Sequence, residues 1–220
     1  MTERPLQTAP LVTDLDQLIG RARGLASGGR RRLLGITGPP GAGKSFVAKA
    51  IARALGPDAA VVGMDGFHLV NSELERLGRR DRKGAPDTFD GAGYVALLRR
   101  LREPAGETVY APRFEREIEE PVAGAVAVGP GVSLVVTEGN YLLCDTGPWA
   151  DVEALLDESW FCDPDEDIRL RRLVARHEEY GKTLLEARAW ASTTDERNAL
   201  LVAPTRSRAD LVVRLDSTGA

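Results

Sequence analysis

A glycine-rich stretch with one lysine, GPPGAGKS at residues 38–45, carries the clearest chemical signal in the sequence. It fits the pattern G-x-x-x-x-G-K-[ST], follows the apolar run LLGIT and precedes a helical pattern. In such a loop the backbone amides and the helix N-terminus attract phosphate, Lys44 reaches the outer phosphates, and the Ser45 hydroxyl holds Mg²⁺. We therefore predict a nucleotide-binding loop made of Gly38, Pro39, Pro40, Gly41, Ala42, Gly43, Lys44 and Ser45, with Phe46 beside it.

Two carboxylates end apolar runs elsewhere in the chain. Asp65 ends AAVVGMD (59–65), and Glu138 lies at the end of SLVVTEG (133–139). The carboxyl ends of parallel strands meet at one edge of a sheet, so both carboxylates are expected beside the phosphate loop. Phosphoryl transfer needs one group to accept the proton of the acceptor hydroxyl and another to fix the metal. We expect Asp65 to be the base and Glu138 to bind Mg²⁺; the alternative for each is a loop-capping role.

A stripe of arginines follows later in the chain. IRLRRLVAR (168–176) places Arg169, Arg172 and Arg176 at i, i+3 and i+7, on one face of a helix. One interpretation is a lid over about 164–182 that closes over the transferring phosphoryl group and neutralises its charge. The alternative is a solvated face whose arginines pair with nearby acids.

The elements that must position these residues are short buried strands alternating with helices. We expect helices within 11–27, 46–55 and 94–101, and a helix whose capping box has Asp163 as N-cap and Glu166 three residues later. Prolines break the alternating segment 109–129, which is expected to be an irregular β excursion. The pattern indicates one α/β domain over 1–220 with the P-loop NTPase fold and a mostly parallel, five-stranded sheet. The acceptor-side excursion is expected over about 71–129, and the strands over 30–37, 59–65, 133–139, 158–162 and 209–215.

Composition limits the class of protein. The 220 residues are 43% hydrophobic and 28% charged, with a net charge of -4, which disfavours broad nucleic-acid binding. Cys144 and Cys162 lack metal-ligand spacing and are expected to be reduced thiols. No run approaches the roughly 20 apolar residues of a spanning helix, and MTERPLQTAP does not resemble a signal peptide. We expect a cytoplasmic monomer or homodimer with no nucleic-acid or membrane partner.

Four blocks of the sequence resemble one superfamily along nearly the whole chain. MDGFHL (64–69), VVTEGNYLL (135–143), DIRLRRLVARH (167–177) and VAPTRSRADLVV (202–213) are similar to blocks of the uridine kinases, phosphoribulokinases and type I pantothenate kinases. RKGAPDTFD (82–90), together with MDGFH, is most similar to bacterial fructose-transport-system kinase-like proteins of the nucleoside/nucleotide kinase family.

The resemblance implies an ATP- and Mg²⁺-dependent kinase. It implies Asp65 as the catalytic base and Glu138 as the metal-side carboxylate. By the same resemblance, Lys44 and the lid arginines Arg169 and Arg172 are catalytic residues, and Thr205 and Arg206 belong to a loop that lies against adenine. The chain departs from uridine kinases, which usually have Ser-Phe-Tyr after the aspartate and a nucleoside-binding Tyr and His where this chain has YAPRFERE (110–117). A pyrimidine nucleoside pocket is therefore not expected.

The acceptor is expected to be a small metabolite with a hydroxyl group: a sugar, a sugar phosphate, a pantothenate-like compound or a nucleoside. Basic residues near 82–83 and 113–116 favour an acceptor that already carries an anionic group. The alternative is that they pair with acids at 115–120. A second function also stays open, a P-loop ATPase or nucleotide-dependent switch acting on a partner protein. The residues expected to contact the acceptor are His68, Arg82, Tyr110, Arg116 and Asn198.

Overall fold

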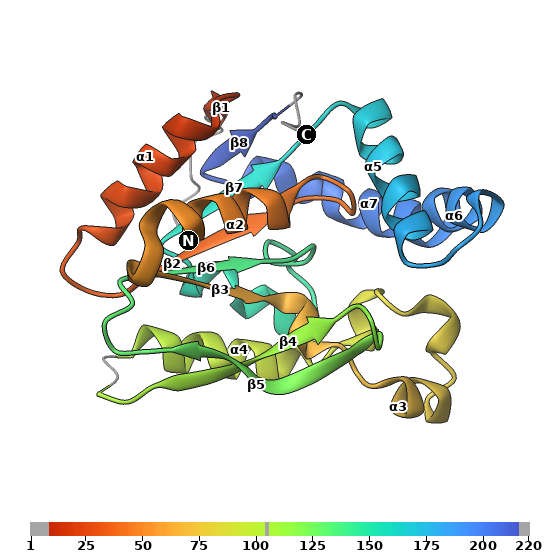
Figure 1. The fold of residues 1–220 in the computed structure, drawn as a ribbon, viewed down its shortest axis with the longest axis horizontal. Coiled ribbons are helices and arrows are strands. Elements are labelled where there is room, and N and C mark those ends of the chain that lie inside the picture. Colours follow the sequence, from red (N-terminus) through yellow and green to blue (C-terminus); the bar gives the residue numbers. More distant parts are fainter. Residues whose placement is uncertain (1–8, 104–105, 216–220) are drawn as a thin grey trace.

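The chain folds around one parallel β-sheet. The computed structural model describes residues 9–103 and 106–215 (Figure 1). The sheet has six strands in the order β1-β8-β7-β2-β6-β3, and every neighbouring pair is parallel. The predicted α/β fold with a mostly parallel sheet is confirmed, with one strand more than expected. The strands are β1 (Leu11–Val12), β2 (Arg32–Thr37), β3 (Ala59–Gly63), β6 (Leu134–Glu138), β7 (Glu158–Cys162) and β8 (Leu211–Val213).

The additional strand is β1, at the edge of the sheet. Its two residues pair with Val212 and Val213 of β8. The helical pattern over 11–27 includes them, but the helix itself begins at Leu15, capped by Asp14. A two-residue strand is too short to show period-two alternation, so only its long-range pairing identifies it.

Helices cover both faces of the sheet and its carboxyl edge. α1 (Leu15–Ala26) and α2 (Lys44–Leu55) pack on one face, and α4 (Gly91–Arg102) packs on the other. α3 (Asn71–Arg76), α5 (Glu166–Glu179) and α6 (Leu184–Trp190) lie beyond the strand arrowheads in Figure 1. A π-helical turn, Ala191–Asp195, joins α6 to α7 (Glu196–Val202).

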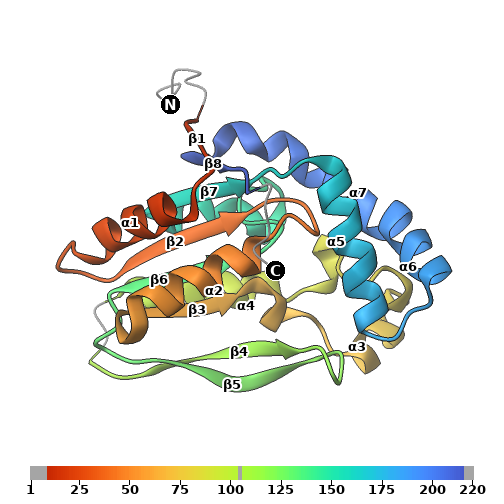
Figure 2. The same cartoon turned by 45° about the horizontal axis from the view of Figure 1, so that its top comes forward.

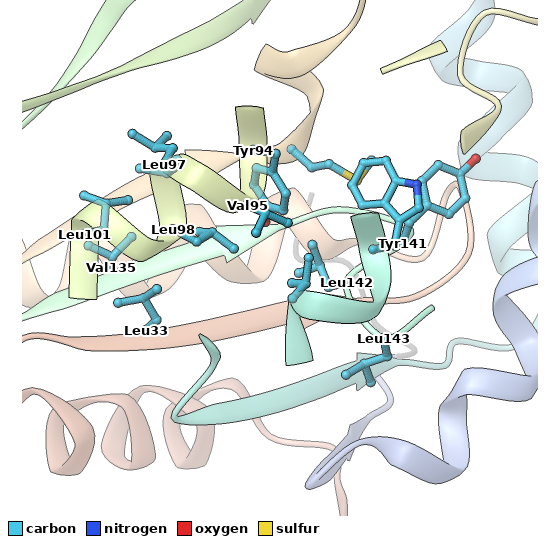
Figure 3. Close-up of a cluster of buried hydrophobic side chains, with 14 of the residues drawn as sticks. Leu33, Tyr94, Val95, Leu97, Leu98, Leu101, Val135, Tyr141, Leu142 and Leu143 are labelled. Atoms are coloured by element: carbon cyan, nitrogen blue, oxygen red, sulfur yellow. The ribbon is translucent and has the colours of Figure 1, made fainter. Parts of the chain in front are cut away.

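Adjacent residues of one strand serve two separate cores. Leu33 of β2 and Val135 of β6 pack with α4, where Leu98 and Leu101 are fully buried (Figure 3). Leu34, the next residue along β2, joins the opposite core with α1 and α2. Successive side chains of a strand point to opposite faces, so a sheet covered on both sides needs continuous apolar strands. This explains why the strands read as apolar runs.

The predicted β excursion is a hairpin of β4 (Val109–Glu115) and β5 (Glu120–Val128), with a register shift between Ala111 and Arg113. It lies directly on the turn after β3. A Cβ atom on Gly66 would lie 2.5 Å from the Pro112 carbonyl oxygen, so only glycine allows this close approach. The hairpin is therefore seated on the turn that carries Asp65.

The predicted capping box at the start of α5 is wrong by two residues. Asp165 is the N-cap, and its side chain accepts a hydrogen bond from the Asp167 amide at 3.0 Å. Asp163 instead continues the sheet, because its amide donates to the Val213 carbonyl at 2.8 Å. Continued strand pairing keeps Asp163 extended and delays the helix.

Candidate active site

The phosphate loop connects β2 to α2. Gly41 (φ 81) and Gly43 (φ 88) adopt the left-handed conformation, and Gly43 is the N-cap of α2. The Lys44 ammonium is buried and donates to the carbonyls of Gly38 and Pro39, both at 2.9 Å. Burial lowers the pKa of Lys44, while the nearby carboxylates of Glu138 and Asp65 raise it. The loop thus holds a desolvated cation at the carboxyl edge of the sheet.

The two predicted carboxylates meet beside this loop. Glu138 ends β6, and its Oε1 accepts a hydrogen bond from the Ser45 hydroxyl at 3.1 Å. Asp65 lies two residues beyond β3, with 37% of its side chain exposed and Arg116 at 3.7 Å. Burial raises the pKa of Glu138, as does the charge of Asp65, while Lys44 opposes both. The two carboxylates therefore differ in their surroundings. Glu138 is hydrogen-bonded to Ser45, whereas the Asp65 side chain is partly exposed in the cleft.

A polar cleft of about 530 Å³ contains all of these groups. The phosphate loop, the start of α2, the turn after β6 and the middle and end of α5 form one side. The turn after β3, the segment 80–89, the hairpin tip and the α6–α7 region form the other. Its lining is rich in both charges, as an ATP-dependent transfer site would need. The basic side chains that line it are Lys44, Lys49, Arg80, Lys83, Arg116, Arg172, Arg176 and Lys182.

The oxygen donors at the loop fit Mg²⁺ better than a transition metal. Within residues 9–103 and 106–215, no group of three or more His, Cys, Asp or Glu side chains could hold a metal. The Ser45 hydroxyl and the Glu138 carboxylate are hard ligands at one point of the cleft. Mg²⁺ binds one or two protein oxygens and completes its shell with phosphate oxygens and water. The donor set therefore fits a nucleotide-bound Mg²⁺.

A second, mostly apolar cavity of about 150 Å³ lies on the other side of the phosphate loop. Phe46 and Arg172 line both this cavity and the polar cleft. The smaller cavity is lined by Ala42, Gly43, Phe46, Val47, Cys162, Arg172, Val213 and Leu215.

Comparison with known proteins identifies the family of this chain. The family model described as "Phosphoribulokinase / Uridine kinase family" matches residues 33–219. The chain belongs to this family. It is accordingly an ATP-dependent small-molecule kinase.

Individual relatives carry different names. "Putative uridine kinase C227.14" of Schizosaccharomyces pombe is 32% identical over 202 residues, which cover 88% of this chain and 85% of that protein. "Uncharacterized protein YggC" of Escherichia coli is 33% identical over 197 residues, with 86% and 80% covered. The crystal structure of a "putative fructose transport system kinase" from Silicibacter sp. TM1040 superposes with a TM-score of 0.78 at 36% identity, covering 89% of this chain and 98% of that one. Over the described residues, no helix is long and apolar enough to cross a membrane.

The arginine stripe of the kinase does not act as one face. Arg169 is 2% exposed and pairs with Glu166 at 2.5 Å and Glu196 at 2.6 Å. It also donates to the Pro40 carbonyl at 3.3 Å, so it ties α5 and α7 to the back of the phosphate loop. Arg169 is therefore not among the residues that line the cleft, and its catalytic role as a lid arginine stays a prediction.

The other two arginines of the stripe do line the cleft of the kinase. Arg172 lies beside Gly43 and donates to the Leu215 carbonyl at 3.1 Å. Arg176 makes no ion pair with a described carboxylate, and burial lowers its pKa. The sequence placed Arg176 on the stripe but not among the site residues, although its i+4 spacing from Arg172 was a usable signal.

The predicted acceptor residues separate into two groups. His68, Arg116 and Asn198 line the cleft. Arg82 does not, because it pairs with Asp87 at 2.6 Å. Tyr110 is 61% exposed, since strand alternation turns its buried neighbours inward and Tyr110 outward. Arg82 and Tyr110 therefore lie outside the cleft lining, and their contact with the acceptor stays a prediction.

Thr205 and Arg206 lie away from both cavities of the kinase. Thr205 is buried and donates to the Val202 carbonyl at 2.8 Å, and Arg206 pairs with Asp163 at 3.0 Å. Neither is among the lining residues. The apolar cavity is bounded instead by the end of β8 and Leu215, and the adenine contact expected of Thr205 and Arg206 stays a prediction.

Proposed function

We propose that this kinase transfers the γ-phosphoryl group of MgATP to a hydroxyl of a small metabolite. One observation carries the proposal: of the acidic side chains that line the cleft, Glu138 and Asp65 are the two whose charges act on Lys44, and only Glu138 is hydrogen-bonded to the phosphate loop. Glu138 accepts from Ser45, whereas the Asp65 carboxylate is 37% exposed toward the acceptor side. An open carboxylate opposite a phosphate site is the arrangement that a hydroxyl acceptor requires.

In this proposal Asp65 takes the proton of the acceptor. The hydroxyl oxygen bonds to the γ-phosphorus, the bond from that phosphorus to the bridging oxygen breaks, and ADP leaves with the bridging oxygen. The hydroxyl proton passes to Asp65. Lys44, Arg172 and Arg176 line the same cleft and would stabilise the charge that spreads over the phosphoryl oxygens.

Ser45 and Glu138 would hold Mg²⁺ in the proposed complex. When bound, Mg²⁺ neutralises charge on the phosphates. The Lys44 ammonium, now bonded to two loop carbonyls, would turn to the outer phosphates.

The apolar cavity next to the phosphate loop suits the adenine ring. Its volume of about 150 Å³ and its lining by Phe46, Val213 and Leu215 fit a flat apolar group. The Arg172 guanidinium lies between this cavity and the polar cleft, where it would stack on the ring or contact the phosphates.

A coupled ADP-release assay across nucleosides, pantothenate, hexoses and sugar phosphates tests the proposal, with the phosphorylated product confirmed by ³¹P NMR. We expect at least one acceptor to raise ADP release well above the rate in water. The matched variant Asp65→Asn should lose that increase and keep ATP binding. ADP release that no acceptor raises, and that Asp65→Asn leaves unchanged, would contradict it and favour a regulatory ATPase.

A further inference from the structure

Four basic residues near the hairpin tip fall into two pairs with different surroundings. Arg82 and Arg113 each pair with an acidic neighbour, at 2.6 and 2.5 Å, and neither lines the cleft. Lys83 and Arg116 do line it. Arg82 and Arg113 are therefore neutralised outside the cleft, whereas Lys83 and Arg116 face it, and Arg116 lies 3.7 Å from the Asp65 carboxylate.

Lys83 is held in place by neutral oxygens. Its ammonium donates to Asn71 Oδ1 at 2.7 Å and to the Glu119 carbonyl at 2.5 Å, and it lies 5.1 Å from the centre of the Phe114 ring. Among residues 9–103 and 106–215, no carboxylate forms an ion pair with it; burial lowers its pKa, while the charges of Glu120 and Glu119 nearby oppose that shift. One N–H of the ammonium stays available to a ligand in the cleft.

Two backbone positions around the Lys83 side chain, Gly84 and Glu119, are held by specific contacts or conformations. The Gly84 carbonyl accepts from the Tyr141 hydroxyl at 2.5 Å and from the Asn198 amide at 3.2 Å. Glu119, whose carbonyl receives Lys83, has φ 53 and is the one non-glycine residue at positive φ in the described chain. Unfavourable backbone at a site persists when the surroundings determine it and often has a functional role.

Further cations lie near Lys83 and the base. Arg116 is 3.7 Å from Asp65 and 5.6 Å from the centre of the Tyr180 ring at the end of α5. Arg80 lines the same part of the cleft and makes no ion pair with any described carboxylate. The tip of the β4–β5 hairpin lies next to α3 in Figure 2, and its Glu120 carboxylate accepts from the Asn71 amide at 2.9 Å.

We infer that the acceptor carries an anionic group, a phosphate or a carboxylate, which Lys83 and Arg116 bind while its hydroxyl faces Asp65. With a neutral acceptor, the partly desolvated Lys83 charge would have only the Glu119 and Glu120 carboxylates nearby, and it forms an ion pair with neither. An anion supplies charge-assisted hydrogen bonds to both side chains, and the guanidinium pairs with either anion through two N–H groups. This inference rests on the phosphotransfer proposed above and defines its substrate class.

Matched acceptor pairs that differ in one anionic group test it. ADP release and product formation are measured with fructose and fructose 6-phosphate, glycerol and glycerate, and panthenol and pantothenate. We expect a pair whose anionic member has a kcat/KM at least about tenfold above that of the neutral member, the change expected from one charge-assisted hydrogen bond.

The variants Lys83→Met and Lys83→Arg identify the group responsible. Lys83→Met should raise KM for the anionic acceptor by roughly tenfold to hundredfold, with ATP affinity and KM for neutral acceptors unchanged. Lys83→Arg should recover most of the selectivity. Arg99→Gln removes an exposed charge on α4 whose one ion pair among the described residues is with Asp151, and it should change nothing. Should Lys83→Met not fold, Arg116→Gln is expected to show the same rise in KM.

Other results separate the two proposals. If the neutral acceptors are phosphorylated efficiently and the anionic acceptors are not phosphorylated, the anion site is overturned but the kinase mechanism is not. A lower Tm in Lys83→Met and Arg116→Gln with unchanged selectivity would show that these residues are only structural ties, and would also overturn the site. ADP release that no compound raises would contradict the phosphotransfer itself, and the anion site would fall with it.

Discussion

The phosphate side of the cleft is made by strand ends and one helix start, whereas the acceptor side is made by turns, a hairpin tip and the end of α5. On the phosphate side, Lys44, Ser45 and Glu138 lie within one motif or at the end of a core strand. On the acceptor side, Lys83 depends on contacts with residues 12 and 36 positions away in the chain. Regular structure therefore fixes the nucleotide groups, and long-range side-chain contacts select the acceptor groups.

The largest loss is expected from Lys44→Ala on the phosphate side. The change removes the only cation inside the loop, so kcat should fall by about 10²–10³-fold and ATP affinity should weaken. Steady-state kinetics and titration with a fluorescent ATP analogue measure both. Arg53→Ala, exposed at the far end of α2, is the control. Normal turnover in Lys44→Ala would show that the loop does not act on the nucleotide.

A loss confined to chemistry is expected from Asp65→Asn, where the two sides meet. The amide keeps the shape of the carboxylate but cannot take the proton, so kcat should fall by roughly 10²-fold or more with ATP affinity within a few-fold. Turnover, ATP titration and Tm are compared with the wild type. Joint loss of ATP binding and Tm would instead make Asp65 a structural residue.

Arg169→Met should affect stability rather than catalysis. Its guanidinium is 2% exposed and bonded to two glutamates, which are themselves 62% and 39% exposed. Allowing for that solvent screening, the loss should be about 1–3 kcal/mol, or about 2–4 °C in Tm for each kcal/mol.

Arg172→Met is the matched comparison on the same helix face. It should lower kcat with little change in the Tm of the nucleotide-free protein, since Arg172 lines both cavities. An unchanged Tm in Arg169→Met with a large loss of kcat would support the interpretation of Arg169 as a lid arginine.

A pH effect on stability is expected from His68 on the acceptor side. Burial lowers the pKa of His68, and its Nδ1–H donates to the Asp65 carbonyl at 2.8 Å. The unfolded chain then binds more protons, so the free energy of unfolding should fall as pH drops through the unfolded value near 6.5, by at most about 1.4 kcal/mol per pH unit. Urea unfolding between pH 5 and 8 should give a smaller slope for His68→Gln. Equal slopes would show that His68 does not cause the effect.

The smallest effect is expected from Arg82→Gln. Its ion pair with Asp87 has both side chains more than 40% exposed, so stability should change by less than about 1 kcal/mol. KM and kcat should change by less than about twofold, the scatter typical of a surface substitution. A rise in KM as large as that of Lys83→Met would place Arg82 in the acceptor site after all.

The phosphate side could be predicted from local spacing alone. The loop pattern fixes Lys44 and Ser45 relative to the helix start, and the apolar runs fix where β3 and β6 end, hence Asp65 and Glu138. These features depend on neighbours within a few residues and on the rule that parallel strands end at one edge.

Only the tertiary structure separated Arg82 from Lys83, and Arg169 from Arg176. Adjacent loop residues have the same sequence signal, but Asp87 binds one while Asn71 and the hairpin tip bind the other. Helical spacing likewise predicts which arginines share a face but not what packs against each of them. Arg169, in the first turn of α5, contacts Glu196 of α7 and the Pro40 carbonyl of the phosphate loop. The physical reason is that the energy of a charge pair depends on the distance between the two charges in space and not on their separation along the chain.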